Sequence, residues 1–552
     1  MAKQKLRVIP LGGLGEIGKN MMALEFDNDI IVIDSGLMFP KEDQYGVDLV
    51  IPDISYLLEN RQNVRAIIIT HGHEDHTGAL PFVLRELKVP VYATRLTLGL
   101  ISVKLKEHRL KNEVKLIEAT PGVQYSLGKF KVEFFSVCHS IPDAAGLIIR
   151  TPVGTVVHSG DFKFDHTPVT GQPCDLGHLA QVAVQQPLLL MSDSTYAELP
   201  GYTPSERRVG ETLDHIFAQA QGRIIVTTFS SLISRVQQVL DAAAAHGRYV
   251  FVVGRSMTEN VRISRELGFL TDTGNMLRSL DQIKGVPLDK IALITTGSQG
   301  EPTSALVRIS NRDHKQLHIV PGDTVVMSAT PVPGNEALVN RTIDNLFRQG
   351  AKVLWDRVAM VHVHGHASQE ELKMLLTLVR PKYFMPIHGE YRHLCLHAEL
   401  AHSLGMPIEN TFVMDDGDVL ELNAKGARIA GKVQAGPIYV NGLSVGDIGG
   451  VILRDRRLLS QDGIVVAIVA MDKRDGSLVG RPDIVSRGFV DENESKELLD
   501  QGRDLLAQSL TRGGPHVAEW GYVSGKTKET LSHFFYEQTK RRPMIVPVLV
   551  EV

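Results

Sequence analysis

At 552 residues the chain is too long to fold around a single hydrophobic core, so two to four domains are expected. With 43% hydrophobic and 22% charged residues, its composition is that of an ordinary soluble globular protein. The formal net charge of −4 argues neither for nor against a nucleic-acid partner, because such binding depends on local patches of charge.

Neither a membrane protein nor a secreted disulfide-rich protein is indicated. No apolar run approaches the roughly 20 residues that cross a bilayer, and the longest candidates, such as 464–471, suit buried strands. The N-terminus lacks the apolar core of a signal peptide. Cys138, Cys174 and Cys395 show neither metal-type CxxC spacing nor a disulfide framework. We therefore expect a cytoplasmic protein with no membrane partner.

The first 205 residues are predicted to form strands and hairpins with helices between them. RAIIIT at 65–70 is typical of a buried strand, and TGALPFVLREL at 77–87 has helical spacing. The segment 21–36 is expected to be a pair of strands with a turn at 27–29. Further strands are expected at 5–13, 131–140 and 145–162.

Beyond residue 205 helices and strands alternate regularly to about residue 350, which is typical of a parallel α/β unit. Strands that end in histidines return at 351–368 and 381–390. A Gly-rich connector follows, and the last hundred residues are predicted to form a small α/β unit. No internal repeat is visible.

The string HGHEDH at 71–76 directly follows the apolar strand. Histidine nitrogens and carboxylate oxygens together suit zinc or manganese. Alternate residues of an extended loop point the same way, so His71 and His73 can hold one ion while Asp75 and His76 turn toward a second. The plainer alternative, surface histidines in a polar turn, poorly explains why the cluster follows a buried strand.

Two ions need four to six ligands, and the sequence offers more at the ends of other apolar strands. His139 follows VEFFSVC, Asp161 follows TVVHSG, and His388 follows YFMPI. Each position alone is a weak signal, because a histidine at the end of a strand is more often a satisfied polar residue. Their joint recurrence favours a two-ion site.

In chain order, Asp34 in VIDSG, the HxHxDH string, His139 and Asp161 in HSGDF resemble the metallo-β-lactamase superfamily. The resemblance implies an α/β fold, the αββα sandwich, with two divalent ions per subunit, Zn²⁺ and/or Mn²⁺. It assigns His71, His73 and His139 to one ion, Asp75, His76 and His388 to the other, and Asp161 to both. Asp34 is expected to hold the ligand loop through hydrogen bonds.

A long interval separates Asp161 from His388, and the α/β segment within it resembles the β-CASP insertion of nucleic-acid-processing members. The three motifs of that insertion are Asp193 in MSDSTYAE, His366 in HVHGHAS, and His388 in PIHGE. PLGGLGEIGKN, GLMFPKEDQYGVDLVIPD, THGHEDHTGALP, SQEELK and the tail resemble the ribonuclease J family over nearly the full length. His364 is a departure, since a small residue is expected at its position.

The resemblance also implies the domain organisation. A metallo-β-lactamase domain in two parts, 1–205 and 351–420, is interrupted by a β-CASP domain at 206–350. A linker at 421–450 precedes a small C-terminal α/β domain at 451–552. Apolar strands in this last domain suit a subunit interface, so a homodimer, or possibly a tetramer, is expected.

A dinucleotide-binding fingerprint is also present, with glycines at 13, 15 and 18 after a strand. That fingerprint requires a helix next, yet MMALEF alternates like a strand and leads into a hairpin. These glycines are expected instead to let the backbone turn near the edge of the active site.

Two divalent ions about 3.5–4 Å apart can lower the pKa of a shared water, which then attacks phosphorus and leaves a 5′-phosphate and a 3′-hydroxyl. Asp75 and His76 are expected to take part in catalysis through the ion that they bind. Asp193 could orient His366 to donate a proton to the leaving oxygen. A purely structural Asp–His hydrogen bond is an equal alternative.

The family resemblance implies two further sites. One is a pocket for a 5′-monophosphate, built from Ser230 and Ser231 and from His362, Val363, His364, Gly365 and His366. Ser231 alone could equally be a helix N-cap. The other is a possible structural Ca²⁺ site near Tyr45, Val47 and Asn441, where an Asn replaces the expected acid.

The leading hypothesis is a metal-dependent ribonuclease of RNA maturation and decay. It would act 5′→3′ on single-stranded RNA with a 5′-monophosphate, with some internal cleavage. A β-CASP nuclease acting on DNA is the nearest alternative, because the sequence does not show contact with a 2′-hydroxyl. A small-molecule metallo-hydrolase and an inactive RNA-binding scaffold are further alternatives; the inserted domain counts against the first, and the intact ligand set against the second.

Overall fold

The computed structural model describes residues 5–41, 43–332, 334–423, 425–442, 444–474, 476–491, 495–511 and 520–552. The chain divides into two compact units, which are described separately: Met1–Phe39 with Leu49–Ile438, and Pro40–Asp48 with Tyr439–Val552. No helix within the described ranges combines the length and the hydropathy needed to cross a bilayer.

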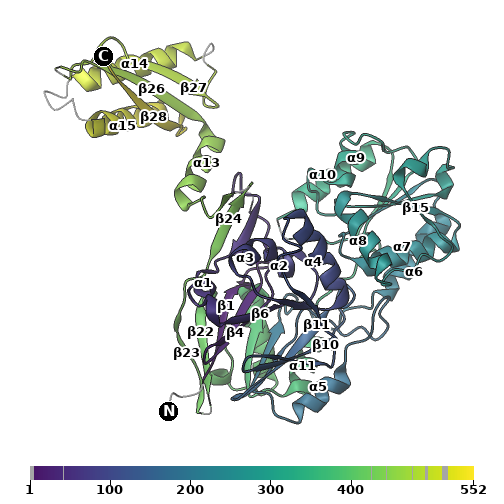
Figure 1. Ribbon diagram of the computed structural model, residues 1–552. Helices are drawn as coiled ribbons and strands as arrows, with labels where there is room; N and C mark the ends of the chain where they lie inside the picture. Colours follow the sequence, from purple (N-terminus) through teal and green to yellow (C-terminus); the bar gives the residue numbers. More distant parts are fainter. Residues whose placement is uncertain are drawn as a thin grey trace. The chain divides into compact units, whose positions relative to one another are not determined.

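Two facing sheets form the body of the first unit (Figure 1). The first sheet has the order β23 (Gly426–Lys432), β22 (Asp418–Asn423), β1 (Leu6–Gly12), β3 (Met21–Phe26), β4 (Asp29–Ile33), β6 (Val64–Ile68), β7 (Val91–Ala93) and β8 (Leu116–Glu118). The second has the order β20 (Tyr383–Ile387), β13 (Leu189–Asp193), β12 (Gly154–His158), β11 (Ala145–Thr151), β10 (Phe130–Ser136) and β9 (Gln124–Leu127).

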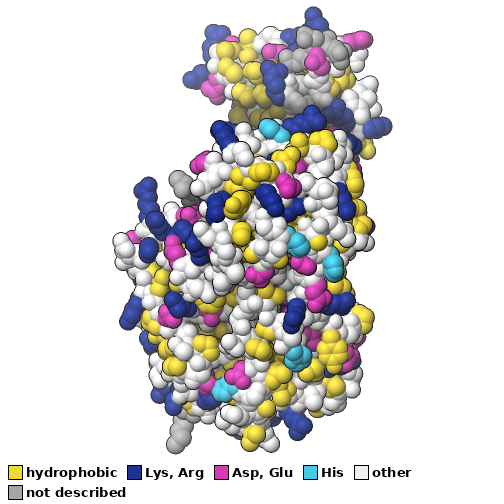
Figure 2. Space-filling view, turned by 90° about the vertical axis from the view of Figure 1, so that its right-hand side faces the viewer, with side chains coloured by type: hydrophobic (Ala, Val, Ile, Leu, Met, Phe, Trp, Pro, Cys, Tyr) yellow, Lys and Arg dark blue, Asp and Glu magenta, His cyan; other side chains and the backbone are white. Residues whose placement is uncertain are grey.

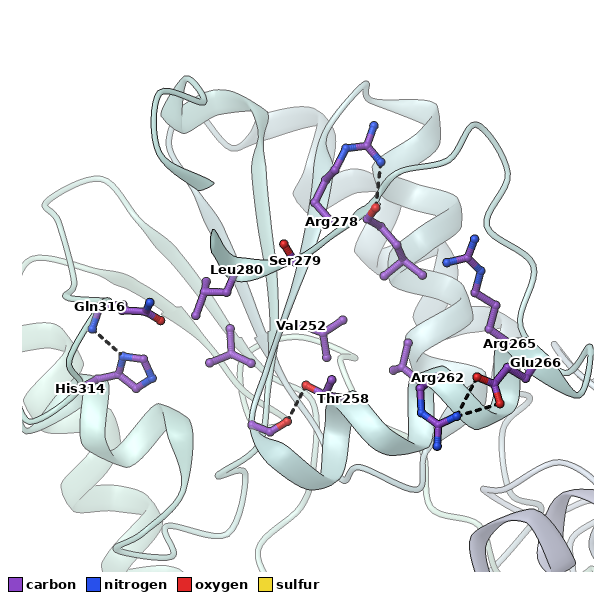
Figure 3. A pocket seen from close by; sticks show the side chains of 14 residues that line it. Val252, Thr258, Arg262, Arg265, Glu266, Arg278, Ser279, Leu280, His314 and Gln316 are labelled. Carbon is purple, nitrogen blue, oxygen red and sulfur yellow. Dashed lines mark hydrogen bonds and ion pairs between the residues drawn. The ribbon is translucent and has the colours of Figure 1, made fainter. Parts of the chain in front are cut away.

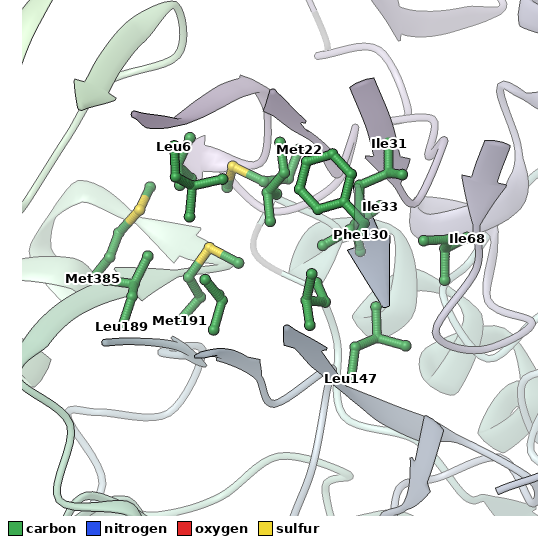
Figure 4. Close-up of a cluster of buried hydrophobic side chains, with 14 of the residues drawn as sticks. Leu6, Met22, Ile31, Ile33, Ile68, Phe130, Leu147, Leu189, Met191 and Met385 are labelled. Carbon is green, nitrogen blue, oxygen red and sulfur yellow. The ribbon is translucent and has the colours of Figure 1, made fainter. Parts of the chain in front are cut away.

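The core of this unit lies between the two sheets (Figure 4). Strands β10, β11, β13 and β20 of the second sheet are mostly buried, with apolar contacts on both faces, so their side chains divide with a period of two. In β10, Val132 and Phe134 face the core, whereas Phe135 belongs to the cluster formed with helices α5 (Leu176–Ala183) and α11 (Gln369–Val379). The sandwich therefore buries near-continuous apolar runs.

The candidate ligands all follow strands that run in the same direction. β12, β13 and β20 are parallel to one another, as are β4 and β6. β10 is antiparallel to β11, which is antiparallel to β12, so β10 also ends at the same edge. Because the carboxyl ends of such strands share an edge, the residues that follow them are brought together.

The inserted segment forms a third, parallel sheet. Its order is β16 (Leu277–Arg278), β15 (Tyr249–Val253), β17 (Ile291–Thr295), β14 (Ile224–Thr227), β18 (Thr324–Met327) and β19 (Lys352–Leu354). One face packs against α6 (Arg207–Gln219), α7 (Ile233–Ala245) and α8 (Arg255–Glu266), and the other against α9 (Ala305–Ser310) and α10 (Glu336–Arg348).

One expected boundary differs from the structure. The linker is expected to begin at residue 421, but residues 421–423 belong to β22 and residues 426–432 to β23, the last two strands at one side of the first sheet. β22 pairs with β1, where Leu422 faces Leu6 and Leu420 faces Val8. The buried leucines of β22 make it part of the core, so the high glycine content of the wider segment was misleading.

The second unit contains a small sheet of β27 (Asp483–Arg487), β26 (Ile464–Met471) and β28 (Met544–Glu551), with β26 in the centre. Helices α14 (Lys496–Thr511) and α15 (Trp520–Thr539) cover one face through a core that includes Val465, Leu506 and Phe535. A further helix, α13 (Gly450–Asp462), has no buried residue.

Candidate metal centre

The HGHEDH string begins three residues after β6 ends, and it is only partly an extended loop. His71 and His73 lie before the short helix α2 (Glu74–Thr77), whereas Asp75 and His76 lie within it. This change of backbone conformation directs the two pairs to different positions.

The first ligand group consists of His71, His73 and His139. His73 Nδ1 lies 3.0 Å from His71 Nε2 and 3.1 Å from His139 Nε2. Ligand atoms about 2.1 Å from a tetrahedral ion lie about 3.4 Å from one another, so three nitrogens at this spacing suit one ion.

The second group consists of Asp75, His76, Asp161 and His388. Asp161 Oδ2 lies 3.2 Å from His76 Nε2 and 3.7 Å from His388 Nε2. The same oxygen lies 3.7 Å from His71 Nε2 and 3.8 Å from His139 Nε2 in the first group. A single carboxylate oxygen therefore stands between the two groups, which is the position of a bridging ligand.

The charges and protonation states of this site also fit divalent cations. Burial lowers the pKa of His73 to about 4, so its imidazole is neutral and offers a lone pair. Burial disfavours the charged form of His388, but Asp161 and Asp193 outweigh it and raise the pKa of His388 to about 10. The carboxylates thus demand positive charge, which a bound cation can provide.

Outer hydrogen bonds hold the imidazole rings in place, as is usual for metal ligands. Asp34 Oδ2 lies 2.8 Å from His76 Nδ1, and its Oδ1 accepts the backbone N–H of Thr70 at 2.8 Å. His139 donates from Nδ1 to the carbonyl oxygen of Gly365 at 2.8 Å. Both Asp34 and His388 have left-handed backbone conformations, with φ of 61° and 53°. Such strain is typical of functional positions.

Asp193 and His366 meet beside this cluster. His366 Nδ1 lies 2.7 Å from Asp193 Oδ2, and its ring stacks on that of His388 with centroids 5.4 Å apart. Burial opposes the charged form of His366, but Asp193 outweighs it and raises the pKa of His366. The pair is therefore positioned beside the ligands and can hold a proton there.

Four family models match consecutive parts of the chain. They are the metallo-β-lactamase superfamily over 14–191, the ribonuclease J β-CASP domain over 221–346, the Zn-dependent metallo-hydrolase RNA specificity domain over 352–414, and the ribonuclease J C-terminal domain over 451–552.

Full-length relatives agree with these matches. Ribonuclease J2 of Bacillus subtilis is 44% identical over 100% of this chain and 99% of its own length. Ribonuclease J 1 of Streptococcus pyogenes is 42% identical over 98% of this chain and 97% of its own length. Ribonuclease J of Thermus thermophilus is 43% identical over 99% of this chain and 95% of its own length.

The chain belongs to the ribonuclease J family. The predicted family and fold class are confirmed, and divalent-metal binding follows from the superfamily. A solved structure described as a protein of unknown function from Enterococcus faecalis V583 has a TM-score of 0.54 at 17% identity, and covers 76% of this chain and 100% of that chain. That likeness shows the fold alone.

The predicted phosphate pocket consists of residues from two segments of the chain, 230–231 and 362–366. Ser230 and Ser231 lie in the turn before α7, whose N-cap is Leu232, so the N-cap alternative for Ser231 is wrong. In the first turn of the helix, Ser234 Oγ donates to the carbonyl oxygen of Ser140 at 3.3 Å, and Ser140 adjoins His139. The start of α7 thus lies against the ligand segment.

The HVHGH loop, residues 362–366, packs against the candidate ligand His139. An added Cβ at Gly365 would lie 2.8 Å from the His139 ring, so only glycine fits there. His364 packs against Tyr196 with ring centroids 4.1 Å apart and the ring planes inclined by 36°, which accommodates the departure from a small residue. Val363 is buried in the core of the inserted domain. Burial lowers the pKa of His362 to about 3.

A buried charge network that the sequence did not reveal supports this loop. Arg235 on α7, fully buried, pairs with Glu206 Oε2 at 2.7 Å and donates to the carbonyl oxygen of Val361. Lys163, 1% exposed, lies 3.6 Å from Glu206 Oε1 and donates to the carbonyl oxygen of His364 at 3.2 Å. These residues hold the start and the middle of the loop, yet no sequence motif marks them.

The glycine-rich segment after β1 behaves as a turn at the edge of the site. Gly13 and Gly15 have φ of 93° and 74°, and β2 (Leu14–Gly15) pairs with β21 (Gly389–Glu390), which directly follows His388. Asn20 Nδ2 then donates to the carbonyl oxygen of Asp75 at 3.0 Å. The segment is therefore structural support for the ligands.

At the possible calcium site, the side chain of Arg456 contacts one of the expected ligand atoms, the carbonyl oxygen of Tyr45. Within the second unit, the carbonyl oxygen of Tyr45 accepts from Arg456 Nη1 at 2.9 Å. Val47 is buried, and no described hydrogen bond uses the side chain of Asn441. The carbonyl oxygen of Tyr45 therefore already accepts one hydrogen bond, and the calcium site stays a prediction.

We expect that Asp161→Asn lowers the metal content of the purified protein from about two ions per chain to less than one, because the bridging charge is lost. Elemental analysis by mass spectrometry after dialysis measures this. His246→Ala is the matched control, since His246 pairs with Asp214 at 2.7 Å outside the cluster. Wild-type metal content in Asp161→Asn would contradict the bridging position.

Proposed function

We propose that the chain is a metal-dependent ribonuclease that degrades single-stranded RNA 5′→3′ from a monophosphorylated end, with additional internal cleavage. The observation that carries this proposal is the pair of ligand groups around Asp161, beside which the chain places a histidine loop, 362–366, directly after the inserted domain. The names of the full-length relatives support RNA as the substrate. We keep the predicted domain bounds, except that residues 421–432 join the first sheet.

Seven side chains would hold the ions: His71, His73, His139, Asp75, His76, Asp161 and His388. When bound, two divalent ions activate water and neutralise charge on the phosphate. Both zinc and manganese suit this ligand set.

In this proposal His366 donates the proton that the leaving 3′-oxygen requires, and Asp193 orients it. The support is geometric, because the 2.7 Å contact fixes Nδ1 on Asp193 and leaves Nε2 available. The ring also stacks on His388, so it lies beside the position of the reacting phosphate. Cleavage then leaves a 5′-phosphate on the remaining chain, which is the substrate of the next round.

The proposed pocket for the terminal phosphate uses Ser230, Ser231 and the HVHGH loop. Its support is the start of α7, where hydroxyls and free backbone N–H groups favour phosphate oxygens. On the face in Figure 2, Lys and Arg side chains are mixed with Asp and Glu. Recognition of RNA is therefore proposed to depend on these local groups.

The first prediction concerns the ends of the substrate. One RNA sequence with a 5′-monophosphate is expected to be degraded faster than the same RNA with a 5′-triphosphate or 5′-hydroxyl, because only the monophosphate fits the pocket. Gel-resolved digestion with Zn²⁺ or Mn²⁺ measures the rates. Equal rates for all three ends would contradict the end pocket and indicate an endonuclease. Faster degradation of a DNA of the same sequence would contradict RNA as the substrate.

The second prediction separates proton donation from a structural role. His366→Ala and Asp193→Asn are expected to reduce kcat by about 10²–10⁴-fold, which is the usual contribution of general acid catalysis. A linkage with sulfur in place of the leaving 3′-oxygen needs no proton, so it should restore most of the rate. An equal loss on both linkages would point to a structural hydrogen bond. His533→Ala, with an exposed side chain, is the control.

The proposal includes a homodimer formed through the second unit. β26 and β28 run parallel, with Val466 opposite Val546 and Ile468 opposite Val548. These residues lie on the face opposite the helices, and Val548 is 40% exposed. An apolar sheet face with an open edge strand favours association.

The third prediction follows from that face. Val548→Lys is expected to convert the dimer to a monomer at micromolar concentration, because a charge would lie in the apolar interface. Light scattering after size-exclusion chromatography measures the mass. Val184→Lys, at a valine that is 84% exposed in the first unit, is expected to leave it unchanged. A Val548→Lys variant that remains dimeric would rule out this face.

A further inference from the structure

A second pocket, of about 810 Å³, lies in the inserted domain and is used by none of the proposed catalytic steps (Figure 3). It lies at the carboxyl end of β15, beside α8. The segment 277–280 and the loop of His314 and Gln316 form its other walls. The carboxyl edge of a parallel sheet is where α/β folds commonly bind ligands.

The lining of this pocket is apolar on one side. Val252 and Leu277 are only partly buried, although both belong to or pack against the core of the domain. Leu280 is likewise half-buried. Incompletely covered aliphatic side chains next to one another offer a surface for a flat ring. The aliphatic lining consists of Val252, Val253, Val261, Leu277 and Leu280.

Three guanidinium groups and one carboxylate make the polar rim. Arg262 pairs with Glu266 at 2.7 Å, and Arg278 donates to the carbonyl oxygen of Leu277 at 2.8 Å. Arg265, which is exposed, has no ion pair among the described residues. Figure 3 shows Arg262 and Arg265 along α8, with Arg278 across the pocket from them. The excess positive charge and the forked donors suit a phosphate group.

His314 adds a directional hydrogen-bond donor. Its Nδ1 accepts the backbone N–H groups of Gln316 at 3.3 Å and Leu317 at 3.2 Å, so the proton of the neutral ring is on Nε2. A base or sugar provides acceptors for such a donor. The pocket therefore combines an aliphatic surface, a cationic rim and one fixed donor.

Helix α8 connects this pocket to the proposed catalytic machinery. Asn260 Nδ2, on the same helix as Arg262 and Arg265, donates to the carbonyl oxygen of Ser230 at 3.0 Å. Ser230 belongs to the turn that is proposed to hold the terminal phosphate. A ligand that contacts α8 is therefore connected to the Ser230 turn through one hydrogen bond, from Asn260.

We infer that this pocket binds a nucleoside phosphate, with the ring against the aliphatic lining and the phosphate between Arg265 and Arg278. The chemistry is the same whether the group is a free mononucleotide or one nucleotide of an RNA strand. The inference goes beyond the proposed nuclease activity, and binding can be measured without turnover.

Calorimetric titration of the full-length protein with AMP tests the free nucleotide. Arg265→Ala/Arg278→Ala is expected to weaken one class of AMP sites by about tenfold or more, the loss of one charge-assisted hydrogen bond. Ser230→Ala/Ser231→Ala should spare that class. Arg348→Ala, at an exposed position of α10, is the matched control. The single variant Arg265→Ala removes one exposed charge without disturbing the packing.

A second titration tests the strand. A 5′-monophosphorylated 20-mer RNA is bound to Asp75→Ala protein, with and without the two arginine substitutions. Weaker AMP binding identifies a free nucleotide, and weaker RNA binding with unchanged AMP binding identifies the strand. The inference is overturned if the arginine substitutions change neither affinity.

Discussion

The buried carboxylate of Asp161 is the constraint on which the first unit depends. One of its oxygens lies within 3.8 Å of the Nε2 atoms of four histidines that follow three different strands. A carboxylate in so dry a position is costly unless positive charge balances it. The sandwich satisfies this requirement because its parallel strands end at one edge. His388, which follows β20 and is far from Asp161 in the sequence, completes the second ligand group.

The inserted domain is joined to this edge by polar contacts rather than by core packing alone. Arg235 and Lys163 share Glu206 and donate to carbonyl oxygens just before the histidine loop, at Val361, and in its middle, at His364. The loop in turn accepts a hydrogen bond from His139 at Gly365. The orientation of a metal ligand is therefore coupled to the position of the domain. Removing one member of such a buried network leaves its partner uncompensated.

That the candidate ligands come together could be predicted from the sequence, because they are chemically unusual residues placed after apolar strands, as with His139 and Asp161. Arg235 could not, because an arginine in an amphipathic helix normally faces solvent, and only the fold shows that it is buried against Glu206. The contact between Arg456 and the carbonyl oxygen of Tyr45 could not be predicted for a similar reason. The two residues are separated by hundreds of positions, and no local pattern joins them.

The late return of the chain has a consequence for protein synthesis. His388 is a candidate ligand, and Gly365 accepts a hydrogen bond from another, His139, although the HGHEDH string is made much earlier. A nascent polypeptide that has not yet extended past residue 388 therefore lacks one member of the second ligand group. The two ligand groups can be completed only after the whole inserted domain has been synthesised.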